Sequence, residues 1–120
     1  MMVKGVGCDI VGNDRFIDAK EGLLRRLFTQ NELSEASERA NAEEFYGSRF
    51  AAKEAFVKAL GTGFGLVQPL DVEIYEDALG APHIRLSEDK EELLRGTSCF
   101  LSISHEKEYS MAMVVLDGKE

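Results

Sequence analysis

The chain has 120 residues, 44% of them hydrophobic and 30% charged, which is the size and composition of a single globular domain spanning residues 1–120. Its formal net charge of −8 excludes broad nucleic-acid binding, which requires a basic surface. No apolar run approaches the ~20 residues of a membrane span, and the N-terminus lacks the apolar core of a signal peptide, so we expect a cytoplasmic protein.

The first predicted element is a strand over residues 3–11. Its side chains alternate, which places Val6, Cys8 and Ile10 on one face. Asp9 lies on the other face together with two glycines, and this pattern indicates that another element or a ligand comes close to the backbone there. We expect Cys8 and Cys99 to be buried free thiols rather than a disulfide.

Helix-capping residues follow the strand. Asn13 or Asp14 can cap a helix that runs to about Phe28. Thr29 and Glu32 have the spacing of a capping box, which predicts a second helix. The two helices are predicted over residues 14–28 and 30–39.

A long third helix over residues 42–60 is predicted between Asn41 as its N-cap and Gly61 as its C′ residue. The remaining elements are strands at 72–76, 83–86, 99–105 and 109–116, and a brief helix at 88–95 capped by Ser87. Helices and strands mix without a regular βαβ alternation. The sequence therefore predicts an α+β fold with the long helix packed on a small, mainly antiparallel sheet.

The third helix carries two distinct faces. One stripe holds Gly47, Ala51, Glu54 and Lys58, and the opposite arc, which should pack on the core, holds Phe45, Ala52, Phe56, Ala59 and Leu60. Arg49 and Lys53 project from within the broader apolar arc, which indicates either snorkelling stems or charges that meet a neighbouring element.

Glu54 and Lys58 allow two interpretations. They form either an exposed i,i+4 ion pair, worth about 0.3–0.5 kcal/mol, or part of a phosphate site. If strand–helix packing brings Asp9 beside Glu54, the two carboxylates supply the hard oxygen ligands that Mg²⁺ prefers. Lys58 would then reach a phosphate as a point charge.

Two further segments also have two interpretations. The run Gly61-Thr62-Gly63-Phe64-Gly65 is either a helix cap running into a turn or a backbone cradle for phosphate, and it matches no P-loop or dinucleotide fingerprint. His105 is either a packed histidine or, with Ser102 and Ser104, part of a phosphate-binding group. The basic residues Arg15, Lys20, Arg25 and Arg26 form either a solvated helix face or a docking patch for an acidic partner.

Taken together, three segments resemble the holo-(acyl carrier protein) synthase family, the short bacterial phosphopantetheinyl transferases. They are Gly5-Val6-Gly7-Cys8-Asp9-Ile10-Val11 followed by Arg15, the block from Arg49 to Gly63, and Ser102-Ile103-Ser104-His105. They occur in the family's order, and the resemblance runs nearly end to end.

This resemblance implies a homotrimer with active sites between subunits. It also implies Mg²⁺-dependent transfer of phosphopantetheine from coenzyme A to a serine of apo acyl carrier protein, which releases adenosine 3′,5′-bisphosphate and supports fatty acid biosynthesis. Asp9 and Glu54 would hold Mg²⁺ and, with Lys58, form the catalytic set. The residues implied to bind coenzyme A are Arg49, Lys58, Gly61, Thr62, Gly63, Ser104 and His105, and those implied to dock the acidic carrier protein are Arg15, Arg25 and Arg26.

Some residues depart from the family pattern. Gly12-Asn13-Asp14 replaces the usual acidic-then-apolar residues, Phe16 stands where isoleucine is common, and Cys8 stands where threonine is frequent. These departures bear on carrier-protein docking and leave the metal and phosphate residues intact. Two other function classes stay open: a nucleotide hydrolase that uses the same carboxylate pair, and a non-catalytic oligomeric module that binds an acidic partner through Arg25 and Arg26.

Overall fold

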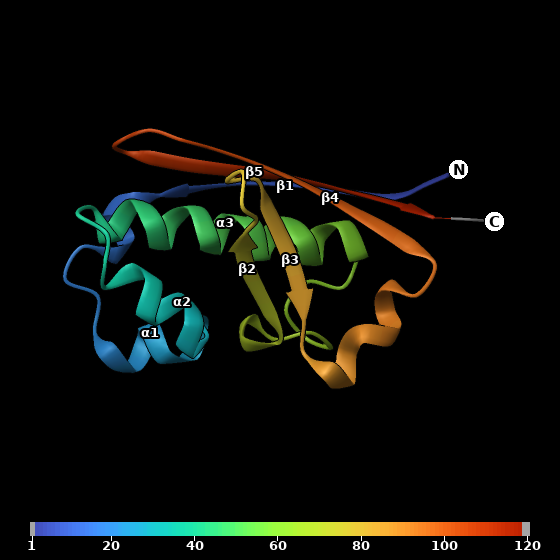
Figure 1. Cartoon of the computed structure of the whole chain (residues 1–120), viewed down its shortest axis with the longest axis horizontal. Coiled ribbons are helices and arrows are strands. Elements are labelled where there is room, and N and C mark those ends of the chain that lie inside the picture. The colour runs from blue at the N-terminus through green and yellow to red at the C-terminus, as the bar shows by residue number, and fades with distance from the viewer. Residues whose placement is uncertain (1, 119–120) are drawn as a thin grey trace.

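The computed structural model describes residues 2–118 of the chain (Figure 1). In chain order the elements are β1 (Met2–Gly12), the 3-10 turn η1 (Asn13–Phe16), α1 (Glu21–Leu27), α2 (Gln30–Ala36), α3 (Ala42–Leu60), η2 (Pro69–Asp71), β2 (Val72–Glu76), β3 (Pro82–Leu86), η3 (Glu88–Leu94), β4 (Thr97–His105) and β5 (Tyr109–Gly118). None of the helices in residues 2–118 combines the length and apolar character that a membrane crossing requires.

The strands form two antiparallel sheets. The larger has the order β1-β5-β4, and β2 and β3 form a separate hairpin. Figure 1 shows α3 running along the three-stranded sheet, with α1 and α2 on the helix's other side. The α+β fold with a long central helix on an antiparallel sheet is therefore confirmed.

β1 lies directly on α3 because its inner face carries glycines. A Cβ added at Gly7 would overlap the carbonyl oxygen of Ala55, and one added at Gly5 would overlap that of Ala59. The element that approaches the glycine face of the strand is therefore α3 itself. This contact brings Asp9, on the same face of β1, against the helix.

The core lies between α3 and both sheets. The predicted apolar arc is confirmed for Phe45, Ala52, Phe56 and Ala59, all of which are buried, whereas Leu60 is only half-buried. Full burial of a side chain such as that of Phe56 contributes about 1.5–3 kcal/mol. The larger core residues contributed by other elements are Phe28, Val67, Val72, Ile74, Leu86, Val114 and Leu116.

The capping signals of α2 and α3 are confirmed. Thr29 and Glu32 form a reciprocal capping box, and Asn41 accepts a hydrogen bond from the backbone N–H of Glu44. Gly61 ends α3 with a φ of 81°, a left-handed conformation that favours glycine. The second helix is shorter than predicted, because it ends at Ala36.

The single helix predicted to run to Phe28 is wrong. A 3-10 turn ends at Phe16, the backbone of Asp18 has a φ of 56°, and α1 begins only at Glu21. The side chain of Asn13 caps no helix, because it is buried and bonds a distant segment of the chain.

Three local expectations also need correction. Ser87 does not cap its helix, which is a 3-10 turn, because its hydroxyl donates to Asp71 and Asp89 instead. Both cysteines are free as expected, but Cys8 is exposed rather than buried. Cys99 is half-buried, and this burial raises the pKa of its thiol to about 11.

Candidate active site

Asp9 and Lys58 meet where β1 crosses α3. The Lys58 ammonium donates to Oδ1 of Asp9 at 2.9 Å and to the carbonyl oxygen of Cys8 at 3.0 Å. The side chain of Asp9 is 11% exposed, whereas that of Lys58 is 52% exposed. Oδ2 of Asp9 is buried and has no hydrogen-bond partner among residues 2–118, so this carboxylate is only half satisfied.

Glu54 completes a carboxylate pair with Asp9. Burial raises the pKa of Glu54, and the neighbouring Asp9 carboxylate raises it further by repelling the ionised form. Arg15 and Lys58 lower the pKa of Glu54 in part. The predicted proximity of Asp9 and Glu54 is therefore present in the structure, and so is a contribution from Arg15 that the sequence did not reveal.

These residues fit a Mg²⁺ ion. Two neighbouring carboxylates with one unpartnered buried oxygen form a site that a cation would satisfy. No cluster of three or more His, Cys, Asp or Glu side chains suited to a metal occurs in residues 2–118, so the protein offers two carboxylates at most. Mg²⁺ commonly binds in this way, keeping waters and substrate phosphate oxygens as its other ligands.

Arg49 lies in a second polar cluster. Its side chain is buried, and its guanidinium donates to Glu76 at 3.1 Å and lies 3.5 Å from Glu35. The guanidinium carbon lies 4.4 Å from the centre of the Phe45 ring, and Nε has no partner among the described residues. The expectation that this charge meets a neighbouring element is therefore confirmed.

His105 joins the same cluster as Arg49. Its Nδ1 contacts a carboxylate oxygen of Glu44, at the start of α3. Both His105 and Arg49 line a cavity of about 260 Å³ together with Glu44 and Glu76. Arg49 and Glu54 are separated by about 140° around the helix axis, since each residue turns an α-helix by 100°. The structure therefore divides the predicted site residues between two sides of α3.

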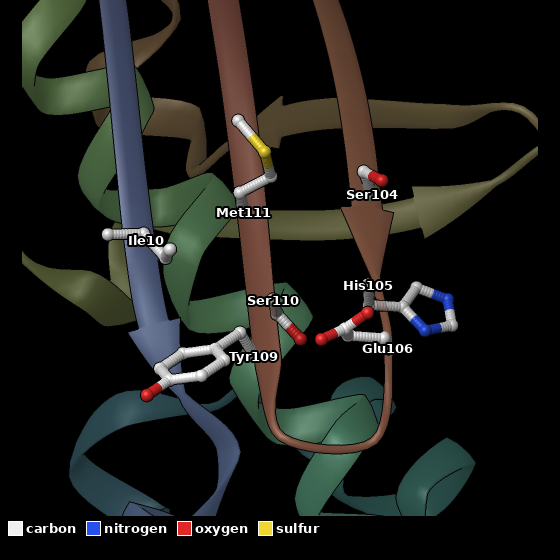
Figure 2. A pocket seen from close by; sticks show the side chains of 7 residues that line it. All are labelled: Ile10, Ser104, His105, Glu106, Tyr109, Ser110 and Met111. Atoms are coloured by element: carbon white, nitrogen blue, oxygen red, sulfur yellow. The ribbon is translucent and has the colours of Figure 1, made fainter.

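Ser104 lies on the opposite face of β4 from His105, because successive side chains of a strand alternate. It lines a second hollow, of about 210 Å³, on the outer face of the sheet, and His105 contributes to the rim of this hollow as well (Figure 2). The structure thus does not bring Ser104 to the carboxylate pair. The hollow is lined by Ile10, Ser104, His105, Glu106, Tyr109, Ser110 and Met111.

The turn after α3 behaves as a helix cap. The backbone N–H of Gly61 donates to Lys58, and those of Thr62 and Gly63 donate to Val57. The Thr62 hydroxyl donates to the carbonyl oxygen of Gly63 at 2.9 Å. The N–H groups expected to cradle a phosphate are therefore engaged by the helix, and contact of this turn with coenzyme A stays a prediction.

The predicted docking arginines are all exposed. Arg15 lies on η1 with its guanidinium carbon 5.6 Å from the centre of the Phe50 ring. Arg25 and Arg26 lie in the last turn of α1, and Arg25 donates to Glu21 at 2.7 Å. These arginines are available to an acidic partner, and Arg15 links their surface to the carboxylate pair.

Comparisons with known proteins identify relatives along nearly the whole chain. Residues 5–114 match the family model described as the 4′-phosphopantetheinyl transferase superfamily. A holo-[acyl-carrier-protein] synthase from a Geobacter species is 40% identical, over 97% of this chain and 99% of that protein. The holo-(acyl-carrier-protein) synthase of Bacillus anthracis, solved in complex with CoA (3′,5′-ADP), is 37% identical, with a TM-score of 0.85 over 99% of this chain and all of that one. The corresponding Neisseria meningitidis structure is 35% identical, with a TM-score of 0.89 over 97% of this chain and 99% of that one.

Proposed function

This chain belongs to the 4′-phosphopantetheinyl transferase superfamily, and on that premise we propose that it transfers phosphopantetheine from coenzyme A to a serine of apo acyl carrier protein. The observation that carries the proposal is the carboxylate pair Asp9–Glu54 beside Lys58. Its unpartnered buried oxygen and adjacent ammonium suit a divalent ion and a diphosphate. The relatives named for this reaction supply the identity of the substrates.

In the proposed reaction, the carrier serine oxygen forms a bond to the β-phosphorus of coenzyme A, and the bond from that phosphorus to the adenosine 3′,5′-bisphosphate breaks. Lys58 neutralises the charge that grows toward the leaving group. Glu54 or Asp9 accepts the serine proton. Mg²⁺ held by Asp9 and Glu54 would supply the positive charge that offsets the diphosphate.

We also propose that the enzyme is a homotrimer whose sites lie between subunits. Arg49 and His105 cannot share a ligand with Asp9 through α3, so a neighbouring copy has to supply them. The outer face of the sheet supports such contacts, because its apolar side chains range from 40% exposed at Met111 to 67% exposed at Ile10. The exposed apolar residues of this face are Val6, Ile10, Phe100, Tyr109, Met111 and Met113.

A mixture of two variants, one that lacks a metal ligand and one that binds coenzyme A poorly, tests the shared site. Asp9→Ala and His105→Ala chains, co-expressed with different tags, would form mixed trimers in which one site in about three is intact, by the geometry of a cyclic trimer. Transfer should therefore recover to about one third of the wild-type rate per mixed trimer, measured at low coenzyme A. A mixture no more active than the average of its parents would contradict a site shared between subunits.

Carrier-protein docking is proposed on Arg15, Arg25 and Arg26, which are exposed and whose charge opposes that of an acidic partner. The free thiols of Cys8 and Cys99 fit a reducing compartment, and we propose the cytoplasm and fatty acid biosynthesis as the setting.

Intact-mass measurement of apo carrier protein is the decisive experiment. With coenzyme A and Mg²⁺ the mass should increase by one phosphopantetheine, and chelation of the metal should abolish the increase. Asp9→Ala and Glu54→Ala should each abolish transfer while thermal unfolding shows an intact fold. Consumption of coenzyme A without a mass increase would identify a hydrolase instead. Binding that survives chelation, with no mass change, would identify a non-catalytic module.

A further inference from the structure

Asn13 is a buried polar residue that has no role in the proposed reaction. It is 1% exposed and follows β1 directly. Its side-chain amide nitrogen donates to the carbonyl oxygens of Glu106 at 2.9 Å and Lys107 at 3.2 Å. Its backbone N–H donates to the carbonyl oxygen of Glu108 at 2.8 Å. Its Oδ1 accepts a hydrogen bond from the Ser110 hydroxyl at 2.8 Å. Four hydrogen bonds thus join one residue to residues 106–110.

Residues 106–110 include the turn between β4 and β5, which begins after the paired residues His105 and Ser110 and whose Tyr109 pairs with Gly12 of β1. The side chains of Glu106, Lys107 and Glu108 are all exposed, and within the turn the Glu106 N–H donates to the carbonyl oxygen of Tyr109 at 2.8 Å. Figure 2 shows His105 just before the turn, pointing away from β1, and Tyr109 just after it, on the β1 side. The position of His105 therefore depends on a turn that Asn13 anchors.

Gly47 makes room for this anchor inside α3. A Cβ at Gly47 would overlap Oδ1 of Asn13 and come within 3.4 Å of the Ser110 hydroxyl. Glycine inside a helix is about 1 kcal/mol less favourable than alanine, so its presence here is explained by the close approach of the Asn13 amide. One side chain thereby joins the end of β1, the middle of α3 and the turn between β4 and β5.

We propose that Asn13 is a positioning residue that fixes His105 within its own subunit, and thereby against the carboxylate pair of the neighbouring subunit in the proposed trimer. The inference rests on the proposed function, in which His105 contacts coenzyme A. Asn13 lies four residues after Asp9 in the chain, and its hydrogen bonds hold the turn against the strand and helix that carry Asp9 and Glu54. A displacement of about 1 Å is enough to weaken the contact of His105 with coenzyme A, so an anchor of this kind matters for the KM.

Steady-state kinetics of Asn13→Ala test the proposal. The KM for coenzyme A should rise about tenfold or more while kcat at saturating coenzyme A changes little, because His105 is displaced rather than removed from a chemical step. Asn31→Ala, an exposed asparagine on α2, is the matched control and should leave both constants unchanged. A folded Asn13→Ala protein with the wild-type KM would overturn the inference.

A double-mutant cycle separates positioning from general stability. If Asn13 acts through His105, adding Asn13→Ala to His105→Ala should not raise the KM for coenzyme A further. Two independent effects that multiply in the double variant would show that Asn13 has only a structural role. Failure of the wild-type protein to transfer phosphopantetheine would refute the proposed function itself, and that result is distinguishable from either outcome of the cycle.

If Asn13→Ala does not fold, two less disruptive variants test whether Asn13 positions His105. Ser110→Ala removes only the hydrogen bond to Oδ1 and should raise the KM for coenzyme A by a smaller factor than the one predicted for Asn13→Ala. Gly47→Ala should raise it as well, because its Cβ displaces the Asn13 amide. Amide hydrogen exchange across residues 105–110 should accelerate in both variants. Unchanged exchange and unchanged KM in both would overturn the inference.

Discussion

Two lysines of α3, Lys53 and Lys58, both meet a carboxylate, but their surroundings differ. Lys53 is 0% exposed and donates to Oε1 of Glu32 at 2.6 Å and to the carbonyl oxygens of Leu27 and Pro69 at 2.7 and 3.0 Å. Lys58 is 52% exposed. Burial lowers the pKa of Lys53, and the Glu32 carboxylate opposes this effect only in part.

The carboxylates differ in the same way. Glu32 is saturated, because Oε1 also accepts from the Thr29 N–H and Oε2 accepts from the Ile74 N–H at 2.9 Å. Asp9, the partner of Lys58, leaves one buried oxygen without a hydrogen-bond partner in the described part of the chain. The pair Lys53–Glu32 has no free hydrogen-bonding atom for a ligand, and it holds α2 and β2 against α3. An unsaturated pair marks the place where a ligand completes the structure.

Substitution of Lys53 should have the largest effect and would confirm its structural role. Lys53→Met leaves Glu32 as a buried unpaired charge, so the free energy of unfolding should fall by about 3–5 kcal/mol. The same substitution at Lys58 removes an exposed pair and should lower it by at most ~1 kcal/mol. Urea unfolding of the two variants measures both values, and equal losses would contradict the comparison.

Activity should rank the two lysines in the opposite order. Lys58→Met should lower kcat for phosphopantetheine transfer by about a hundredfold, because one charge aimed at the phosphate is lost. Lys53→Met, assayed in the cold where its folded fraction is high, should keep kcat within a few-fold of the wild-type value. A Lys58→Met enzyme with full kcat would remove this lysine from the mechanism.

The pH dependence of metal-free stability provides a third test. The pKa of Glu54 is raised in the folded protein, so protonated Glu54 favours the folded state over the unfolded one. This contribution to the free energy of unfolding is fully present below the ordinary pKa of glutamate and is lost as the pH rises through the raised pKa. The increase in Tm on adding Mg²⁺ should therefore grow between about pH 5 and 7. Glu54→Gln should show neither the pH trend nor the Mg²⁺ effect, and a wild-type Tm indifferent to Mg²⁺ would argue against the metal site.

The smallest effects are expected at the exposed pair Arg25–Glu21, which adds a third kind of ion pair to the comparison. Both side chains are mostly exposed, so the pair leaves Arg25 free to meet a partner. Arg25→Glu should raise the KM for carrier protein several-fold with unchanged kcat, and the effect should shrink at high salt. Arg95→Glu, an exposed arginine just before β4, is the control. An equal effect of both variants would indicate general charge rather than docking.

Local chemistry made much of this molecule predictable. The caps of α2 and α3 and the alternation of β1 follow from residues that are close in sequence, and so does the stripe that carries Glu54 and Lys58. Asn13 shows where such reasoning fails. Its type and position suit a helix cap, but its amide bonds a carbonyl 93 residues away, and only the folded chain decides between those partners.

The placement of Arg49 and His105 shows a second limit. The helical period places Arg49 away from Glu54, but the sequence does not reveal that His105 contacts Glu44 and lines one cavity with Arg49. The serine pattern and the family resemblance assign Ser104 and His105 to one phosphate-binding group, although adjacent strand residues point to opposite faces.

The glycines of β1 have a consequence for ion choice. Since β1 touches α3 through Gly5 and Gly7, backbone atoms alone set the width of the gap between strand and helix. Hard cations are sorted by size, with oxygen distances of about 2.0–2.1 Å for Mg²⁺ and about 2.3–2.6 Å for Ca²⁺. A methyl group on Gly7 would wedge the two elements apart and shift the enzyme's preference toward the larger ion. In the proposed metal site, the absence of a side chain at Gly5 and Gly7 would therefore keep strand and helix close enough to favour magnesium over calcium.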